Sequence, residues 1–170
     1  MKHLYIIRHG QSEYNRDGLL AGTTDTPLTD VGREQAHEAG AQLRDKSIDY
    51  ILCSPLSRAH ETATIIAGEI GYDPTLIEVN ELARERNFGE LEGSHWYERP
   101  LTGTPGIETK EALLERVQKL YDYVKTRPED TILIVAHGSF IRAFRNVIDP
   151  NQPYIDALIP TVNAKLEQLV

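Results

Sequence analysis

The sequence predicts an α/β fold, a three-layer α/β/α sandwich around a mostly parallel central sheet. Three apolar runs, at residues 4–7, 50–53 and 131–136, have the β-branched and aliphatic composition of buried strands. Stretches with the apolar spacing of helices lie between them, and such alternation favours a parallel sheet covered on both faces. The chain of 170 residues has the length of one compact domain, so we expect a single domain over residues 1–170.

The first and third of these runs end in the same way. Residues 4–7 stop at Arg8. Residues 131–136, which form the clearest strand pattern in the chain, stop directly at His137. In both places a histidine and a glycine follow, as His9-Gly10 and His137-Gly138. Each pattern predicts a buried strand that runs directly into a turn.

Four helices are expected between the strands. The first begins after the cap residue Thr29, and the second runs from Ser57 to a stop at Gly71. Apolar positions at helical spacing mark a third over residues 113–124, and Ser139 is expected to cap a fourth. The first helix is predicted to turn one stripe inward, formed by Val31, Gln35, Ala36, Ala39 and Leu43.

Three segments have weaker patterns. Residues 75–79 predict a fourth, less regular strand, and residues 93–106 have the Gly, Pro and Trp content of a long surface loop that shapes a pocket. By periodicity alone residues 162–170 fit a helix, but we favour a strand there.

The charge balance narrows the range of partners. Acidic residues outnumber basic ones, 26 to 18, for a net charge of −8 and a pI near 5.2, which disfavours nucleic acid and anionic membranes. Any cationic pocket is therefore local. The single Cys53 lies in an apolar run and predicts a buried thiol in a reducing compartment. No segment has the length of a signal peptide core or a membrane span, so we expect a cytoplasmic protein.

Polar residues suited to phosphate chemistry follow three predicted strands. In open α/β sheets, ligands bind beyond the carboxyl ends of the strands, so these groups can meet at one edge. Arginines supply paired donors for phosphoryl oxygens, and a neutral imidazole is a nucleophile when its second nitrogen is held as a donor. On these grounds either His9 or His137 qualifies as the nucleophile of a phosphoryl transfer. The three strand ends are Arg8-His9-Gly10, Ser54-Pro55-Leu56-Ser57-Arg58 and His137-Gly138-Ser139.

Four ordered segments resemble the signature of the histidine phosphatase superfamily, also called the phosphoglycerate mutase-like family: residues 8–15, 54–63, 85–93 and 136–138. The resemblance implies the phosphoglycerate mutase-like fold, with residues 159–163 similar to a late strand of the family. It implies that His9 is transiently phosphorylated and that Glu85 donates a proton to the leaving alcohol. The implied phosphate contacts are Arg8, Asn15, Gly22, Arg58, His137 and Gly138, of which Arg8, Arg58 and His137 also stabilise the transition state.

Several alternatives stay open. Glu81 competes with Glu85 as the acid, although the resemblance favours Glu85. Arg142 and Arg145 are interpreted mainly as charges that point outward or pack against the surface. Contact of either side chain with a substrate is the less favoured alternative. We expect no metal and no cofactor, because the usual ligand spacings are missing from the sequence. His95 is close in sequence to the third segment, residues 85–93. The histidines expected outside the core site are His3, His37, His60 and His95.

The expected activity is that of a metal-independent phosphatase, a phosphoric monoester hydrolase of the histidine acid phosphatase type. The alternatives are a cofactor-dependent phosphoglycerate mutase and a non-catalytic phosphate-binding module. Only about fifteen residues separate Gly93 from Glu108. The mutases of the family that the sequence resembles carry a longer insertion between these two places. The expected substrate is a small phosphorylated metabolite, with sugar phosphates, phosphoglycerates, phosphoserine and α-ribazole phosphate all open. A homodimer is left open as well.

Overall fold

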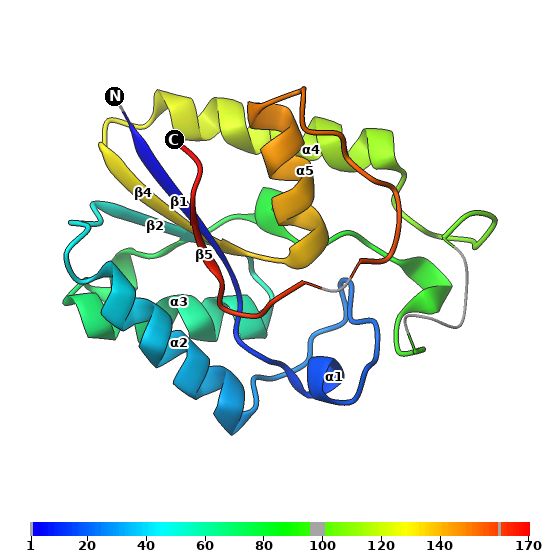
Figure 1. The fold of residues 1–170 in the computed structure, drawn as a ribbon, viewed down its shortest axis with the longest axis horizontal. Coiled ribbons are helices and arrows are strands. Elements are labelled where there is room, and N and C mark those ends of the chain that lie inside the picture. Colours follow the sequence, from blue (N-terminus) through cyan, green and yellow to red (C-terminus); the bar gives the residue numbers. More distant parts are fainter. Residues whose placement is uncertain (1, 96–100, 160) are drawn as a thin grey trace.

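The computed structural model describes residues 2–95, 101–159 and 161–170. Within them, one central sheet has the strand order β3-β2-β4-β1-β5, seen from its edge in Figure 1. The pairs β1–β4, β2–β4 and β2–β3 are parallel, and only β5 runs antiparallel, beside β1. The strands are β1 (His3–Arg8), β2 (Tyr50–Cys53), β3 (Glu78–Val79), β4 (Thr131–Ala136) and β5 (Leu166–Gln168).

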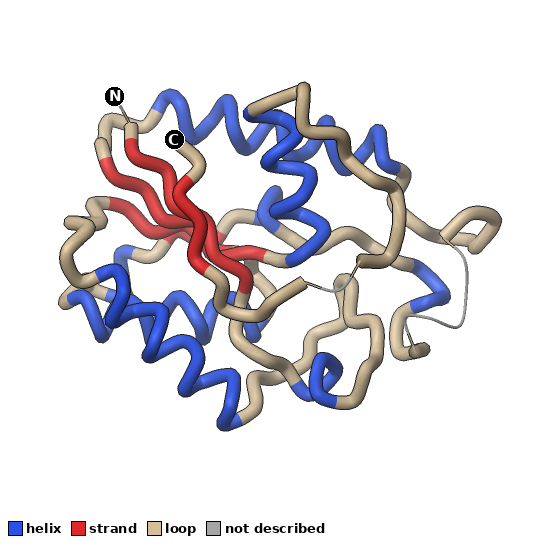
Figure 2. The backbone as a smooth tube through the Cα atoms, in the orientation of Figure 1, coloured by secondary structure: helices blue, strands red, loops and turns tan. Residues whose placement is uncertain are grey.

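Helices cover both faces of the sheet. Two of them, α2 and α3, pack together on one face, and α4 and α5 pack together on the other, with loops gathered at one end (Figures 1 and 2). The α/β sandwich predicted from the sequence is confirmed. The helices are α1 (Glu13–Arg16), α2 (Asp30–Leu43), α3 (Ser57–Ile70), α4 (Lys110–Thr126) and α5 (Gly138–Ile148), with short 3-10 turns at Pro74–Leu76, Glu81–Ala83 and Gly89–Leu91.

The central strands fill both halves of the core because successive side chains point to opposite faces of the sheet. In β1, Leu4 and Ile6 pack toward α4 and α5, while Tyr5 and Ile7 pack toward α2 and α3. Strand β4 divides its residues in the same way and is buried along its whole length. Burial on both faces explains why these strands are continuous apolar runs in the sequence.

The weaker strand predictions are only partly correct. Over residues 75–79, strand pairing is confined to Glu78–Val79, because Pro74 and the side chain of Asp73, which accepts from the amide of Thr75, wind the preceding segment into a 3-10 turn. The C-terminal strand is confirmed at Leu166–Gln168, but no strand forms over the described part of residues 159–163. Within it, the carbonyl of Thr161 accepts a hydrogen bond from the side chain of Arg8.

Helix boundaries agree with the sequence in three cases and differ in one. Thr29 caps α2, α3 begins at Ser57 and ends at Gly71 in the left-handed conformation, and α4 spans the third pattern. Helix α5 begins two residues earlier than expected, at Gly138, and Ser139 is not its cap. The amide of Ser139 donates instead to the carboxylate of Glu85, a residue from another segment that replaces the local cap.

The inward stripe of α2 is confirmed at Ala36, Ala39 and Leu43 but was wrong at Val31. Val31 is 55% exposed, whereas the buried side of α2 consists of Gly32, Ala36, Ala39, Gly40 and Leu43. Small residues dominate that side because α2 packs directly against α3. Gln35 faces the loop after β1, where its Oε1 accepts a hydrogen bond from the amide of Gln11.

Two further expectations concern loops and membranes. Part of the predicted loop at 93–106, including Trp96, lies outside the described residues, so its role in shaping the pocket stays a prediction. Among the described residues, no helix is both long enough and apolar enough to cross a membrane.

Candidate active site

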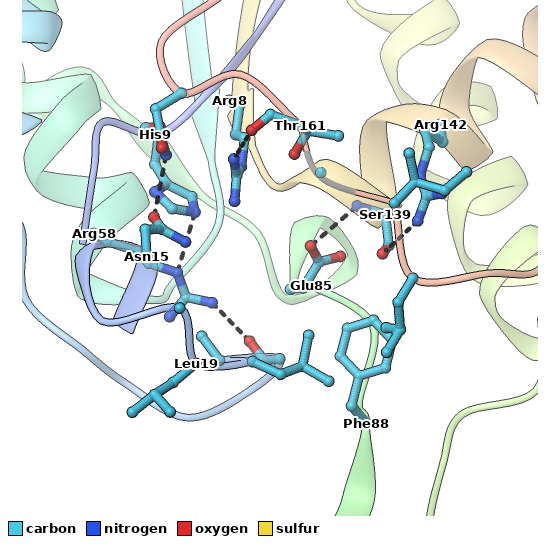
Figure 3. A pocket seen from close by; sticks show the side chains of 18 residues that line it. Arg8, His9, Asn15, Leu19, Arg58, Glu85, Phe88, Ser139, Arg142 and Thr161 are labelled. Atoms are coloured by element: carbon cyan, nitrogen blue, oxygen red, sulfur yellow. Dashed lines mark hydrogen bonds between the residues drawn. The ribbon is translucent and has the colours of Figure 1, made fainter. Parts of the chain in front are cut away.

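A pocket of about 210 Å³ opens beyond the carboxyl ends of β1 and β4 (Figure 3). Its described walls combine cations, one carboxylate and an apolar rim, and they come from segments far apart in the sequence. Drug-sized ligands usually occupy cavities of roughly 300–1,000 Å³, so this pocket suits a small molecule. The lining residues used below are Arg8, His9, Asn15, Gly22, Arg58, Glu85, Phe88, Gly138, Ser139, Arg142, Leu158, Ile159, Thr161 and Asn163.

His9 is held in one tautomer. Its Nδ1 lies 2.6 Å from the carbonyl oxygen of Gly10, which can only accept, so Nδ1 carries the proton. Nε2 is then the lone-pair nitrogen, and Arg58 Nε donates to it at 3.2 Å. Burial, followed by the charges of Arg58 and Arg8, lowers the pKa of His9 well below its usual value of 6.5. The imidazole is therefore neutral and has its nucleophilic nitrogen beside the arginines.

Arg58, at the start of α3, is 1% exposed and yet forms no ion pair with a described carboxylate. Its terminal nitrogens donate to the carbonyls of Gly22 and Thr24, each at 2.7 Å. These neutral acceptors orient the guanidinium without cancelling its charge. Gly22 thus contributes through its carbonyl to the placement of Arg58, besides lining the pocket.

Glu92 holds the loop that positions Arg58. Its carboxylate accepts from the amide of Thr23 at 2.7 Å and from the hydroxyl of Thr24 at 2.6 Å. Gly22 has φ +54°, and a Cβ there would lie 2.2 Å from Glu92 Oε1, so the loop can approach only with glycine. No role was predicted for Glu92 from the sequence, because no spacing in the sequence links it to Arg58.

Arg8 reaches the pocket from the end of β1 and is held by the C-terminal segment. Its guanidinium donates to the carbonyl of Thr161, while Asn163 Nδ2 donates to the carbonyl of His9 at 3.1 Å. Burial lowers the pKa of Arg8 to about 10, against the attraction of Glu85, so the side chain remains charged at neutral pH. The residues near 161–163 were not predicted to belong to the site, since they are more than 150 residues away from β1.

Asn15 lies in the short helix α1 and lines the pocket. Its Oδ1 accepts from the amide of Ser12 at 3.0 Å and from Asn163 Nδ2 at 3.1 Å. With the oxygen occupied by these donors, the side-chain amide nitrogen is the group left to donate to a ligand.

His137 lies behind His9, with 5.1 Å between the ring centroids. Its Nε2 is 2.7 Å from the hydroxyl of Ser54, and Nδ1 is buried with no hydrogen-bond partner in the described structure. Burial, with Arg58 next, lowers the pKa of His137 well below 6.5. His137 is not part of the described pocket wall, whereas the adjoining Gly138 is.

Glu85 and Glu81 occupy different environments. Glu85 lines the pocket, is 9% exposed, and accepts from the amides of Ser139 and Phe140 at the start of α5, both at 3.1 Å. The side chain of Glu81 is 72% exposed, pairs with Arg84 and is not part of this wall. The geometry thus supports Glu85 over Glu81 as the acid.

The structure corrects the interpretation of Arg142, which was expected mainly as an outward or packing charge. Arg142 lines the pocket, whereas Arg145 pairs with Glu167 of β5. The helical spacing of Arg142, three residues after Ser139, is the only sequence signal that could have indicated this.

The predicted buried thiol and the predicted places of the remaining histidines outside the core site agree with the structure. Cys53 is fully buried, and burial raises the pKa of its thiol to about 12, which leaves it unreactive. The histidines His3, His37 and His60 are exposed, and His95 is half-buried with Nδ1 3.3 Å from the carbonyl of Gly18. Within the described residues, no group of three or more His, Cys, Asp and Glu side chains is arranged to hold a metal ion.

The two buried histidines predict a pH dependence of stability. Below a pH of about 6.5 the unfolded chain takes up protons on both histidines, while the folded protein does not. The free energy of unfolding therefore decreases as the pH is lowered. Together the two groups contribute a slope of up to about 2.7 kcal/mol per pH unit. Urea unfolding of His137→Asn between pH about 5 and 7 is expected to show a slope smaller by up to about 1.4 kcal/mol per pH unit, the full difference being reached at the acid end of this range. An unchanged slope would contradict the neutral buried state of His137.

Comparison with known proteins places the chain in a family. Residues 4–158 match the model of the histidine phosphatase superfamily (branch 1). The chain is 35% identical to the uncharacterized phosphatase PhoE of Bacillus subtilis over 99% of this chain and 88% of that protein. It is also 35% identical to the 2,3-bisphosphoglycerate-dependent phosphoglycerate mutase of Cytophaga hutchinsonii, over 90% and 80% of the two chains.

A solved structure shows the same likeness in three dimensions. The mycobacterial glucosyl-3-phosphoglycerate phosphatase superposes with a TM-score of 0.83 at 26% identity, covering 99% of this chain and 92% of that one. Phosphatases and mutases thus both occur among the relatives. The match over most of the chain, together with the shared fold, shows that this protein belongs to the histidine phosphatase superfamily.

Proposed function

We propose that the protein is a phosphatase that hydrolyses small phosphate monoesters through a phosphohistidine on His9, without a metal ion. The observation that carries this proposal is the fixed tautomer of His9. Its Nδ1 is held by the carbonyl of Gly10, and its basic Nε2 lies beside Arg58 in a small pocket lined by Arg8 as well. This arrangement presents a neutral nucleophile to an anionic group held by cations.

In the first step, His9 Nε2 attacks phosphorus and the bond to the ester oxygen breaks. Arg58 transfers its Nε donor from His9 to a phosphoryl oxygen, and Arg8 and the amide nitrogen of Asn15 supply further donors. The tautomer of His137 depends on its contact with Ser54. When the hydroxyl of Ser54 donates to Nε2, His137 carries its proton on Nδ1, and this nitrogen has no partner in the described structure. Glu85, entering this step protonated, gives its proton to the leaving oxygen.

In the second step, water attacks the phosphohistidine on the side that the alcohol has left. Glu85, now a carboxylate, accepts a proton from that water, and the bond between phosphorus and Nε2 breaks. Inorganic phosphate and neutral His9 are the products, so the enzyme returns to its starting state. One carboxyl group can serve both steps because it lies in the pocket wall opposite the nucleophile (Figure 3).

The short segment between Gly93 and Glu108 supports hydrolysis over transfer of the phosphoryl group to a phosphoglycerate, because the mutases of the resembled family carry a longer insertion there. The mutase of Cytophaga hutchinsonii among the relatives favours phosphoglycerate mutase activity as the second candidate. The small pocket supports a small phosphorylated metabolite as the substrate. A cytoplasmic location and the absence of a nucleic-acid or membrane partner remain predictions, and a homodimer stays an open alternative.

A panel of phosphate esters tests the proposal. Purified protein in EDTA is assayed for phosphate release from p-nitrophenyl phosphate, phosphoserine, 3-phosphoglycerate and a sugar phosphate, with acid-labile, base-stable phosphoprotein as the signature of phosphohistidine. We expect release that EDTA does not reduce. If transfer to a phosphoglycerate outpaces release to water, the protein is a mutase instead. If neither occurs, it is a non-catalytic phosphate-binding module.

A further inference from the structure

The arginines of this protein fall into two groups by their partners. Eight of the eleven in the described residues lie within 4.0 Å of a carboxylate oxygen. The other three, Arg8, Arg58 and Arg142, have no such partner among the described residues, and all three line the same pocket. In a chain with a net charge of −8, this placement gathers three arginines without an ion-pair contact at one ligand site, where Glu85 is the carboxylate among the described lining residues. Arg8 and Arg58 serve the phosphoryl group in the proposed mechanism, which leaves Arg142 without a role.

Arg142 is held in place by neutral groups only. Its terminal nitrogens donate to the carbonyl of Ala157 at 3.2 Å, and one of them also donates to the hydroxyl of Ser139 at 3.1 Å. The guanidinium carbon lies 5.7 Å from the centre of the Tyr154 ring. These contacts fix the side chain but leave its positive charge available to an anion.

The position of Glu85 shows which part of a substrate Arg142 faces. The amide of Ser139 donates to Glu85, and the hydroxyl of Ser139 accepts from Arg142, so Arg142 lies next to the acid. Figure 3 shows Glu85 between Arg8 on one side and Ser139 with Arg142 on the other, with His9 and Arg58 beyond Arg8. Since Glu85 must reach the leaving oxygen, the alcohol portion of the substrate extends toward Ser139 and Arg142.

We infer that Arg142 and Ser139 bind a carboxylate on the leaving alcohol, so that the preferred substrate is a phosphate monoester of a hydroxy acid. This inference rests on the proposed phosphatase function. A carboxylate fits better than a second phosphate, because three of the five N–H donors of Arg142 are already in use, which leaves one hydrogen on a terminal nitrogen and the buried Nε. A phosphate would need donors for three oxygens, whereas the other described groups nearby include the apolar Phe88, Leu158 and Ile159.

A pair of ligands that differ only in a carboxylate tests this inference. O-phosphoserine and O-phosphoethanolamine are measured as competitors of p-nitrophenyl phosphate hydrolysis, which needs no turnover of either compound. In the wild type we expect phosphoserine to bind about 10 to 100 times more tightly, as for a charge-assisted hydrogen bond. In Arg142→Gln this ratio of inhibition constants is expected to fall close to one, and in Arg142→Lys to take an intermediate value.

Arg145→Gln is the matched control, because Arg145 lies on the same helix but pairs with Glu167 away from the pocket. It is expected to keep the wild-type ratio. If Arg142→Gln weakens both ligands equally, or if the wild type does not prefer phosphoserine, the inference is wrong while the phosphatase proposal stands. Absence of phosphate release from every ester of the panel by the wild type would instead overturn the proposed function itself.

Discussion

Replacement of His9 by alanine is expected to lower kcat for p-nitrophenyl phosphate at least about 10,000-fold and to eliminate the phosphoprotein. The size of the effect follows from the role of Nε2, which forms the covalent bond to phosphorus and has no nearby substitute. His137 is the nearest other imidazole, but its Nε2 is engaged by Ser54 and the residue lies outside the described pocket wall. Phosphate release and trapped phosphoprotein are measured on the same preparations.

His60→Ala serves as the control for His9→Ala. His60 is an exposed histidine in α3, two residues from Arg58, and its loss is expected to change kcat less than about twofold. His9→Asn, which keeps a polar group beside Arg58, separates loss of chemistry from loss of folding, and thermal unfolding is followed for each variant. Activity of His9→Asn or His9→Ala above about 1% of wild type would show that another group is the nucleophile.

Glu85→Gln is expected to have an effect that depends on the leaving group. With an alkyl ester such as glycerol phosphate, kcat is expected to fall roughly 100- to 10,000-fold, because the alkoxide leaves without a proton donor. With p-nitrophenyl phosphate the first step needs no proton, since p-nitrophenolate is a good leaving group. The second step still lacks its base, so a burst of p-nitrophenol and an accumulating phosphoprotein are expected in rapid-mixing experiments.

Glu81→Gln is the matched comparison. Glu81 is exposed and paired with Arg84, so its change is expected to leave both esters within about twofold of wild type. A burst in Glu81→Gln and none in Glu85→Gln would assign the acid to Glu81. Because the carboxylate of Glu85 also accepts amides at the start of α5, the unfolding temperature of Glu85→Gln is measured beside its kinetics.

Much of the fold could be predicted because its strands are unambiguous in composition. Residues 131–136 and 4–7 are buried on both faces, which requires apolar side chains at every position, and both segments form strands in the structure. The predictions were wrong where a contact with another segment of the chain overrode the structure that the local sequence favours. Val31 is exposed because α2 turns its small residues toward α3, and Ser139 is no cap because Glu85 supplies the acceptor.

The sequence by itself determined the α/β class and, through the segments that resemble the histidine phosphatase superfamily, the membership that the family match shows. It also identified groups that meet in one pocket, since parallel strands place their carboxyl ends at one edge of the sheet. Only the tertiary structure brought Arg142 and the segment near Thr161 to that pocket, and it placed Glu85, which the resemblance favoured, in the pocket wall and left Glu81 exposed. The reason is physical: which carbonyl holds a cation, and which carboxylate is buried, depend on contacts between separate segments, such as Arg8 with Thr161 and Glu85 with the start of α5, which no local spacing encodes.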